Sequence, residues 1–285
     1  MTLPPVRCGR FVLEFGRRTL IMGIINMAPD SFSGDGLAGD AGAAEALAYE
    51  MQAAGASLLD VGGRSTRPGA PPVEVVEELR RTVPAVRRVA GAGLPVSIDT
   101  TSSRVAAAAL DAGAVMVNDV SGLRNDPGMP RLVAAAGAPV VIMDWDDRGG
   151  LPDAVTVTAA FLRERIAFAV DAGIAETQIL VDPGYGFGLA VHQNLEILRR
   201  LREFTVLGRP ILIGTSRKGS IGRVLNLPVH DLVEGTAATV AVAIMNGGDV
   251  VRAHDVKAIV RVARMTDAIV RGLPPAGQRA GEPGS

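Results

Sequence analysis

Carboxylate and amide side chains end several short apolar runs of this chain. Asp99 ends ProValSerIleAsp, Asn118 ends AlaValMetValAsn, and Asp182 opens the glycine-rich turn AspProGlyTyrGlyPheGly. Such a run is typical of a buried parallel strand, which delivers the polar residue at its carboxyl end to the mouth of a site. The sequence therefore indicates that these polar ends converge on one active site.

The types of these residues favour a particular ligand. Asp99, Asn118 and Asp182 offer carboxylate and amide edges without a histidine cluster, which suits a flat, nitrogen-rich heterocycle better than a catalytic zinc ion. A buried carboxylate can accept two parallel hydrogen bonds from a guanidine-like N–C–N edge. Met143 and Phe187, near neighbouring strand ends, are candidates for the apolar faces of such a pocket. The alternatives are a helix cap for each polar residue and ordinary core for each apolar one.

Cations follow the last two apolar runs. ThrSerArgLysGly carries Lys218, and ArgAlaHisAsp carries Arg252 and His254. Arg252 and His254 alternate along a strand end and can face one way, as a multiply charged diphosphate would require. Loops after strands seven and eight of an α/β barrel are a frequent phosphate site. The alternative is a surface ion pair.

The elements that must position these residues alternate along the chain. Eight apolar runs alternate with eight helical patterns, which predicts a single (β/α)₈ barrel of the α/β class. A doubly wound sheet would need fewer strands and a GxGxxG-type turn, and neither is seen. The expected strands are residues 20–25, 57–61, 95–99, 115–118, 139–143, 178–182, 210–214 and 249–252. The expected helices are residues 42–54, 73–90, 102–112, 128–136, 153–172, 191–204, 231–246 and 255–271.

Composition narrows the class of protein further. The chain has 285 residues, 29 basic and 30 acidic, with a net charge of −1, so nucleic acid and anionic membranes are disfavoured as partners. Cys8 is the only cysteine, and the polar start lacks the apolar segment of a signal peptide, so we expect a cytoplasmic protein. Residues 1–19 are expected to be a lead-in segment, 20–273 the barrel and 274–285 a disordered tail.

Eight motifs in chain order resemble those of dihydropteroate synthase and cover about residues 20 to 271. They are AsnMetAlaProAspSerPheSer, AspValGlyGlyArgSerThrArgProGlyAla, SerIleAspThr, AsnAspValSerGly, AspProGlyTyrGlyPheGly, ThrSerArgLys, GluGlyThrAlaAlaThrValAla and ArgAlaHisAspVal. The resemblance implies a (β/α)₈ homodimer that condenses 6-hydroxymethyl-7,8-dihydropterin diphosphate with 4-aminobenzoate in folate biosynthesis and is a sulfonamide target. The alternatives are a paralogue with a different acceptor, and a pterin-binding methyltransferase, which would need no diphosphate site.

The same resemblance implies a role for individual residues. The catalytic residues would be Asp99, Asp182, Lys218, Arg252 and His254. The pterin pocket would be formed by Asp99, Asn118, Met143, Asp182, Phe187, Gly214 and Lys218. Diphosphate would be bound by Asn26, Arg67, Arg252 and His254, with Mg²⁺ as cofactor and Asn26 as its ligand. The 4-aminobenzoate subsite would contain Phe32, Thr66, Arg67, Pro68, Lys218 and Gly219.

Several positions depart from the family's usual pattern. Arg64 stands where an acid is common, Asp144 where a histidine is common, and Leu189 where a lysine is common; Gly219 and Ser220 replace the usual Ser-Phe pair. These positions bear on the acceptor subsite and its loops. We expect Arg64 to be an exposed side chain with little effect on the acceptor.

Overall fold

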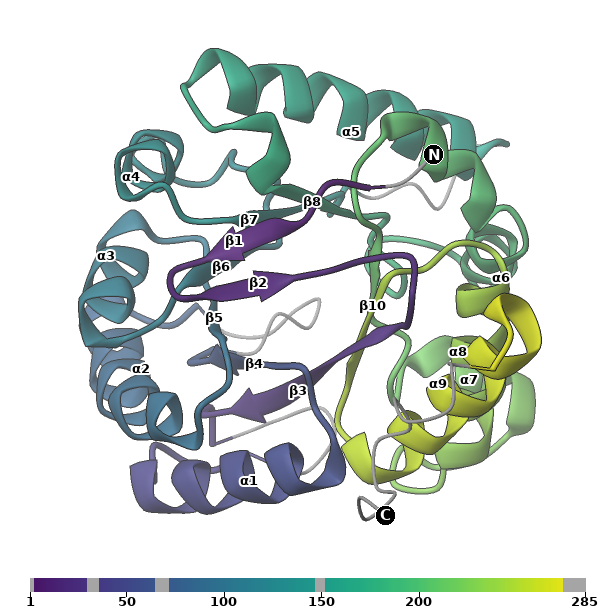
Figure 1. Ribbon diagram of the computed structural model, residues 1–285, viewed down its shortest axis with the longest axis horizontal. Coiled ribbons are helices and arrows are strands. Elements are labelled where there is room, and N and C mark those ends of the chain that lie inside the picture. The colour runs from purple at the N-terminus through teal and green to yellow at the C-terminus, as the bar shows by residue number, and fades with distance from the viewer. Residues whose placement is uncertain (1–2, 30–35, 65–71, 147–151, 274–285) are drawn as a thin grey trace.

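Eight parallel strands form a barrel at the centre of the molecule (Figure 1). The computed structural model describes residues 3–29, 36–64, 72–146 and 152–273. The strands pair in the order β8-β7-β6-β5-β4-β3-β10-β9, and a parallel bridge between Val181 and Ile211 closes the ring. The strands are β3 (Leu20–Asn26), β4 (Leu58–Gly62), β5 (Val96–Asp99), β6 (Met116–Asp119), β7 (Val140–Met143), β8 (Ile179–Asp182), β9 (Leu212–Ile213) and β10 (Val250–Ala253). The predicted (β/α)₈ barrel is confirmed.

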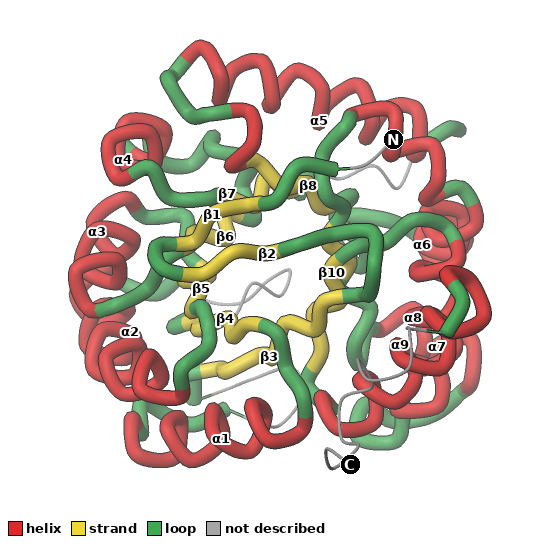
Figure 2. Tube along the Cα trace, in the orientation of Figure 1, coloured by secondary structure: helices red, strands yellow, loops and turns green. Residues whose placement is uncertain are grey.

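Helices surround the barrel on all sides (Figure 2). They are α1 (Ala41–Ala54), α2 (Val75–Val89), α3 (Ser103–Ala112), α4 (Met129–Ala136), α5 (Ala154–Asp171), α6 (Val191–Arg199), α7 (Gly219–Leu225), α8 (Val233–Met245) and α9 (Val256–Arg271). Short 3₁₀ turns lie at η1 (Ala90–Ala92), η2 (Glu176–Gln178) and η3 (Leu201–Leu207). In the described part of the chain, no helix combines the length and the apolar character that a membrane crossing requires.

Two helical segments differ from the sequence prediction. The helix expected over residues 191–204 ends at Arg199, and η3 follows it. Leu201, Phe204 and Leu207 are the buried residues of η3, and their spacing of three matches the three residues per turn of a 3₁₀-helix. The short helix α7 was not predicted, because Gly219 and Gly222 weaken any helical pattern there.

A hairpin closes one end of the barrel. β1 (Val6–Cys8) and β2 (Phe11–Leu13) pair antiparallel within the segment that the sequence assigned as a lead-in. Figure 1 shows this hairpin across the near mouth of the barrel. Its buried side chains join one apolar cluster with residues near the beginnings of the barrel strands, including Leu20, Leu58 and Val250. The amino-terminal mouth is therefore filled with apolar side chains, and a polar site can form only at the carboxyl end.

Alternation along the strands builds the floor of that site. Leu58, Met116, Leu180, Leu212 and Val250 belong to the apolar cluster beneath the hairpin. Residues two positions further along a strand point to the same side. Those residues are Asp60, Asn118, Asp182, Gly214 and Arg252. A layer of largely polar side chains thus lies directly above an apolar floor.

Candidate active site

The guanidinium of Arg252 joins two buried carboxylates inside the barrel. Its Nε donates to Asp60 Oδ2 at 2.7 Å, and its Nη2 donates to Asp99 Oδ2 at 2.9 Å. Asn118 Nδ2 donates to the same oxygen of Asp60 at 3.0 Å. The structure therefore brings three of the predicted site residues, Asp99, Asn118 and Arg252, into one network.

Asp60 is the member of this network that the sequence analysis missed. It lies in the middle of β4 and is fully buried, between residues of the apolar run LeuLeuAspValGly. A charge inside a buried strand requires a partner, since an unpaired buried charge is very unfavourable. An aspartate within an apolar run could have indicated a buried, paired charge. Its partner Arg252 could not be identified in the same way, because it is distant in sequence.

Two buried carboxylate oxygens in the network have no hydrogen-bond partner among the described residues. They are Asp60 Oδ1 and Asp99 Oδ1. Burial raises the pKa of Asp99 to about 7, against the charge of Arg252, which lowers it, while Asp60 adds a further rise. The network thus contains a carboxylate whose pKa depends on its charged neighbours and whose Oδ1 has no hydrogen-bond partner among the described residues.

Asp182 presents a third buried carboxylate at the end of β8. Its Oδ1 accepts from the Gly184 backbone N–H at 2.8 Å, which is the side-chain turn that Asp commonly makes two residues on. Burial raises the pKa of Asp182 to about 6, and the Gly184 hydrogen bond and the charges of Lys218 and Arg252 oppose this rise. Asp182 is therefore mainly ionised at neutral pH and can accept hydrogen bonds from a nitrogen-rich ring.

The glycines of the turn after β8 are required by close contacts. Gly184 has φ +74°, and a Cβ there would lie 1.9 Å from the carbonyl oxygen of Asp144. Gly186 has φ +83°, and a Cβ there would lie 2.6 Å from Lys218 Cδ. The turn thus holds the β8 loop against both the β7 loop and the lysine.

The ring of Phe187 lies against the lysine. Lys218 Nζ lies 3.7 Å from the centroid of the Phe187 ring, and Phe187 in turn lies 6.0 Å from Trp145, the only tryptophan of the chain. A cation over an aromatic face is held by the quadrupole of the ring. Burial and then the charge of Arg252 lower the pKa of Lys218 to about 8, so it remains mainly charged at neutral pH. Met143 pairs in register with Asp182 and is buried beside it.

The loops after β9 and β10 are tied together. Ser216 Oγ lies 2.9 Å from His254 Nδ1 and accepts from the His254 backbone N–H at 3.2 Å. Arg217, with φ +56°, makes a two-pronged ion pair with Asp255 at 2.7 and 3.1 Å. Both contacts fix where His254 emerges relative to Lys218. The loops that carry the predicted cations Lys218 and His254 are therefore joined by hydrogen bonds and an ion pair.

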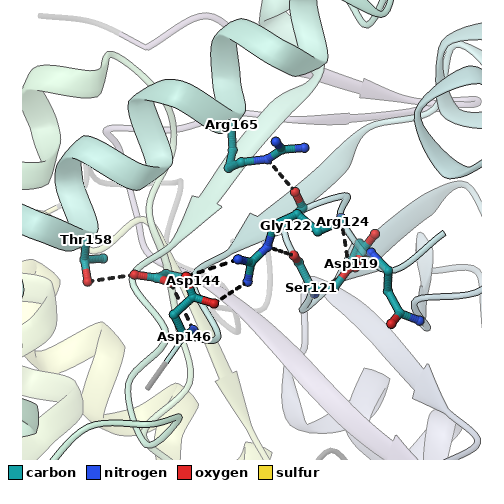
Figure 3. A network of polar contacts seen from close by, with 9 residues as sticks. Asp119, Ser121, Gly122, Arg124, Asp144, Asp146, Thr158 and Arg165 are labelled. Carbon is teal, nitrogen blue, oxygen red and sulfur yellow. Dashed lines mark hydrogen bonds and ion pairs between the residues drawn. The ribbon is translucent and has the colours of Figure 1, made fainter. Parts of the chain in front are cut away.

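A second network supports the loops after β6 and β7 (Figure 3). Thr158 of α5 donates to Asp144 at 3.0 Å, and Arg124 makes a two-pronged ion pair with Asp146 at 2.7 and 3.1 Å. Arg165 donates from Nε to the Gly122 carbonyl at 2.8 Å. These contacts join α5 to the loop that carries Trp145. Asp144, which replaces a common histidine, is thus a buried structural anchor.

The remaining predicted residues divide into two groups. Asn26 ends β3, and its amide oxygen accepts from the Ala28 backbone N–H at 2.9 Å; Gly214 lies beside the Arg252 Cβ. Gly219 begins α7 directly after Lys218. Phe32, Thr66, Arg67 and Pro68 lie outside the described residues.

The position of Arg64 differs from the sequence prediction. The sequence analysis expected an exposed side chain, but Arg64 is partly buried, and its Nη2 donates to Thr101 Oγ1 at 2.6 Å. The prediction was wrong because β4 delivers this side chain toward the end of β5, where buried polar groups can pair with it.

The sequence of this barrel matches a known enzyme family. A family described as pterin binding enzymes matches residues 22–254, from β3 to just past β10. The chain is 42% identical to a dihydropteroate synthase of Bacillus subtilis over 259 residues, 90% of this chain and 91% of that protein.

Solved structures agree with these sequence matches. Xanthomonas albilineans dihydropteroate synthase with 4-aminobenzoic acid superposes with a TM-score of 0.89 at 39% identity, covering 96% of this chain and 100% of that one. Burkholderia cenocepacia dihydropteroate synthase complexed with 7,8-dihydropteroate superposes with a TM-score of 0.85 at 38% identity, covering 94% and 98%. The chain belongs to the pterin-binding enzyme family and, within it, to the dihydropteroate synthases.

Proposed function

We propose that this protein condenses 6-hydroxymethyl-7,8-dihydropterin diphosphate with 4-aminobenzoate to give 7,8-dihydropteroate and diphosphate. The observation that carries the proposal is the polar layer with Asn118, Asp182 and Arg252 above an apolar floor, joined by Asp99 at the end of β5 and by the charge of Lys218. The bound 4-aminobenzoic acid and 7,8-dihydropteroate of the two similar structures support it.

The pterin is proposed to bind within the polar layer. The ionised Asp182 would accept two hydrogen bonds from the N–C–N edge of the ring, because charge-assisted pairs of this kind are strong and directional. Asp99 Oδ1 has no hydrogen-bond partner among the described residues and would accept a further N–H. Met143 and Phe187 would contact the faces of the ring, with Gly214 leaving space beside Arg252.

The chemical step is proposed to separate charge. The bond between the pterin methylene carbon and the diphosphate oxygen breaks, and both electrons leave with the diphosphate. The arylamine nitrogen then attacks the methylene carbon and loses a proton to water. Asp182 would stabilise positive charge on the pterin, while Arg252 and His254 would stabilise the departing anion. Arg252 already donates from Nε to Asp60 and from Nη2 to Asp99. It would therefore contact the anion through Nη1.

We further propose that Mg²⁺ accompanies the diphosphate. Among the described residues, no three His, Cys, Asp or Glu side chains are grouped to hold a metal ion. Such a site fits Mg²⁺ carried mainly by substrate phosphates and water, because this ion often takes only one or two protein ligands. Asn26, with a hard amide oxygen at the end of β3, would supply that ligand. Bound Mg²⁺ would neutralise charge on the diphosphate.

4-Aminobenzoate, the acceptor, is proposed to bind next to the pterin on the side toward solvent, in contact with Lys218 and Gly219. Phe32, Thr66, Arg67 and Pro68 remain predicted members of this subsite. Sulfonamides would compete with 4-aminobenzoate there. The cytoplasmic location stays a prediction.

An assay of diphosphate release tests this function. The purified protein is incubated with the pterin diphosphate and Mg²⁺, with and without 4-aminobenzoate, and the pterin product is identified by mass spectrometry. We expect release that depends on the arylamine and yields 7,8-dihydropteroate. Tight pterin binding without arylamine-dependent release would overturn the proposal and favour a paralogue with a different acceptor.

We also propose that the protein is a homodimer. Exposed apolar residues gather on α7, α8 and α9, which lie together on one side of the barrel in Figure 1. These residues are Val224, Leu225, Val242, Met245, Met265, Ile269 and Val270. Exposed apolar side chains on neighbouring helices are typical of an association interface, and a two-fold axis would bury them against a second copy of the same helices.

Charged substitutions on α9 test the dimer. Met265 and Ile269 are 63% and 69% exposed and lie one helical turn apart, so Met265→Asp with Ile269→Asp should give a monomer by light scattering. Val76→Asp on α2, at a residue 71% exposed, is the matched control and should leave a dimer. A monomeric wild-type protein would contradict the proposal.

A further inference from the structure

Two buried hydroxyl groups join the turn after β8 to the beginning of α7. Ser220 Oγ donates to Tyr185 Oη at 2.7 Å, and the two residues are 7% and 1% exposed. Among the residues that the structure describes, no other hydrogen bond joins this turn to α7 or to the loop before it. The two segments are therefore held together from inside the protein by one polar contact.

The ring of Tyr185 fixes one end of this bond. Tyr185 belongs to the large apolar cluster that the strands share with the surrounding helices, and a ring in a close-packed core cannot shift without opening a cavity. The turn is also held by α6, where Asn194 Oδ1 accepts from the Gly186 N–H at 2.5 Å. Asn194 Nδ2 donates to the carbonyl oxygens of Leu189 and Ala190, each at 3.0 Å. The tyrosine hydroxyl is thus a fixed point to which α7 is attached.

Lys218 lies between the turn and the other end of the bond. It directly precedes α7, and the Ile221 N–H donates to its carbonyl oxygen at 3.0 Å, so the first turn of the helix connects it to Ser220. Its side chain passes Gly186, where a Cβ would lie 2.6 Å from Lys218 Cδ, and its Nζ ends 3.7 Å from the centroid of the Phe187 ring. Three consecutive residues of the β8 turn therefore contact α7 or the lysine before it.

We infer that Ser220 is a positioning residue of the active site, which holds Lys218 against the turn after β8 through its hydrogen bond to Tyr185. The inference rests on the proposed function, in which Lys218 contacts the pterin and 4-aminobenzoate, and deepens it. Ser220 stands where the family commonly has phenylalanine. A hydrogen bond fixes distance and direction more narrowly than apolar packing does, so this chain sets the position of the lysine by a polar contact.

A double-mutant cycle separates positioning from stability. Ser220→Ala and Tyr185→Phe each remove one hydroxyl and leave the other buried without this partner, so each should lower the melting temperature. The double variant removes both hydroxyls, and its melting temperature should return toward that of the wild type, because replacing both partners by apolar groups of the same shape is nearly neutral.

The kinetic constants should behave differently from the melting temperature. All three variants lack the bond, so each should raise KM for 4-aminobenzoate about threefold or more, the double variant included. The value of kcat should change by less than about twofold, since the departing diphosphate is assigned to Arg252 and His254. A bond that contributed only stability would give the double variant the KM of the wild type.

Trp145 provides a second readout that needs no turnover. It is the only tryptophan of the chain, and its ring centroid lies 6.0 Å from that of Phe187. When Lys218 leaves the Phe187 ring, the surroundings of Trp145 change, so fluorescence emission should shift in all three variants. Thr266→Val is the matched control, because it removes a buried hydroxyl of α9 that donates to the Val262 carbonyl at 2.9 Å. It should change neither KM nor emission.

Two results would overturn the inference. They are a wild-type KM in the double variant and an unchanged Trp145 emission in all three variants. The proposed function fails separately, when wild-type protein binds the pterin and releases no diphosphate with 4-aminobenzoate. In that case the emission of Trp145 still tests whether the bond holds Lys218 in place.

Discussion

At the scale of single residues, the site is defined by buried charges that depend on one another. Arg252 lies between Asp60 and Asp99, and Asn118 shares the Asp60 oxygen. Removing one member of such a group leaves another charge unpaired, which costs more than the lost contact itself. Substitutions within the network therefore change the protonation of neighbours as well as local contacts.

Asp182→Asn should abolish most of the affinity for the pterin. The variant amide keeps an oxygen for the Gly184 N–H, but its other group is a donor, which cannot accept from the N–C–N edge. We expect the dissociation constant measured by calorimetry to be at least tenfold larger, which is a loss of about 1.4 kcal/mol of binding free energy. Asp249→Asn is the matched control, because Asp249 is also buried with its pKa raised to about 6, but lies at the beginning of β10. Equal effects of the two variants would remove Asp182 from the pterin pocket.

Asp60→Asn should lower the pH at which half of the affinity for the pterin is lost, which is the midpoint of pterin binding. The negative charge of Asp60 raises the pKa of Asp99, so its removal should lower that pKa and extend binding to lower pH. The amide oxygen of the variant can still accept from Arg252 Nε, which limits structural damage. Calorimetry across pH measures the midpoint, and an upward shift would show that Asp60 acts mainly by holding Arg252 in place.

At the scale of elements, the turn after β8 positions the β7 loop and Lys218 relative to the end of the strand. Its backbone passes so close to Asp144 and Lys218 that glycine is required at two positions. The carbonyl of Asp144 belongs to the β7 loop, which α5 supports through Thr158. A change in the turn should therefore displace the aromatic contacts of Lys218.

Gly184→Ala separates steric contact from backbone strain. Gly184 and Gly137 both have positive φ, +74° and +59°, but a Cβ at Gly137 meets nothing within 4 Å. Gly137→Ala should therefore cost only the left-handed backbone penalty, about 1–2 kcal/mol. Gly184→Ala should destabilise the protein more and reduce pterin binding. Thermal melts and calorimetry of the two variants measure the difference, and similar melting temperatures would contradict the close approach to Asp144.

At the scale of the whole molecule, the polar site reduces stability in the absence of ligand. Burial raises the pKa of Asp99 to about 7 and that of Asp182 to about 6, so both retain protons in the folded state above the ordinary aspartate pKa near 4. Between about pH 4 and 7 the folded state thus binds more protons than the unfolded state, and stability falls as pH rises. The lowered pKa of Lys218 acts in the opposite direction, raising stability between about pH 8 and 10.

Asp182→Asn should therefore stabilise the ligand-free protein at neutral pH. Relative to wild type, the melting temperature should be similar near pH 4 and higher by about 2 °C or more at pH 7.5. Differential scanning fluorimetry across pH measures this gap. If the difference in melting temperature between variant and wild type shrinks as pH rises, the pKa of Asp182 is not raised in the folded protein. A variant that is more stable but binds the pterin less tightly is expected when the replaced residue serves function at a cost in stability.

The sequence alone determined the order of the barrel elements and much of the site. Apolar runs of four to six residues ending on Asp99, Asn118 and Asp182 predicted both the strands and the mouth that they share, because alternation and burial are local consequences of residue type. The expected strands begin and end close to the observed ones. The β1–β2 hairpin and α7 were missed, since each is short and stabilised mainly by contacts with the barrel.

Tertiary structure alone decided how the charges are paired. Asp60 meets Arg252 across 192 positions of sequence, and Arg64 meets Thr101 across 37. No local pattern encodes such partners, because ring closure brings together side chains from strands at opposite ends of the chain. Charge pairing depends on distance and burial in three dimensions, so the ionisation of Asp99 and the partly buried position of Arg64 emerged only from the folded barrel.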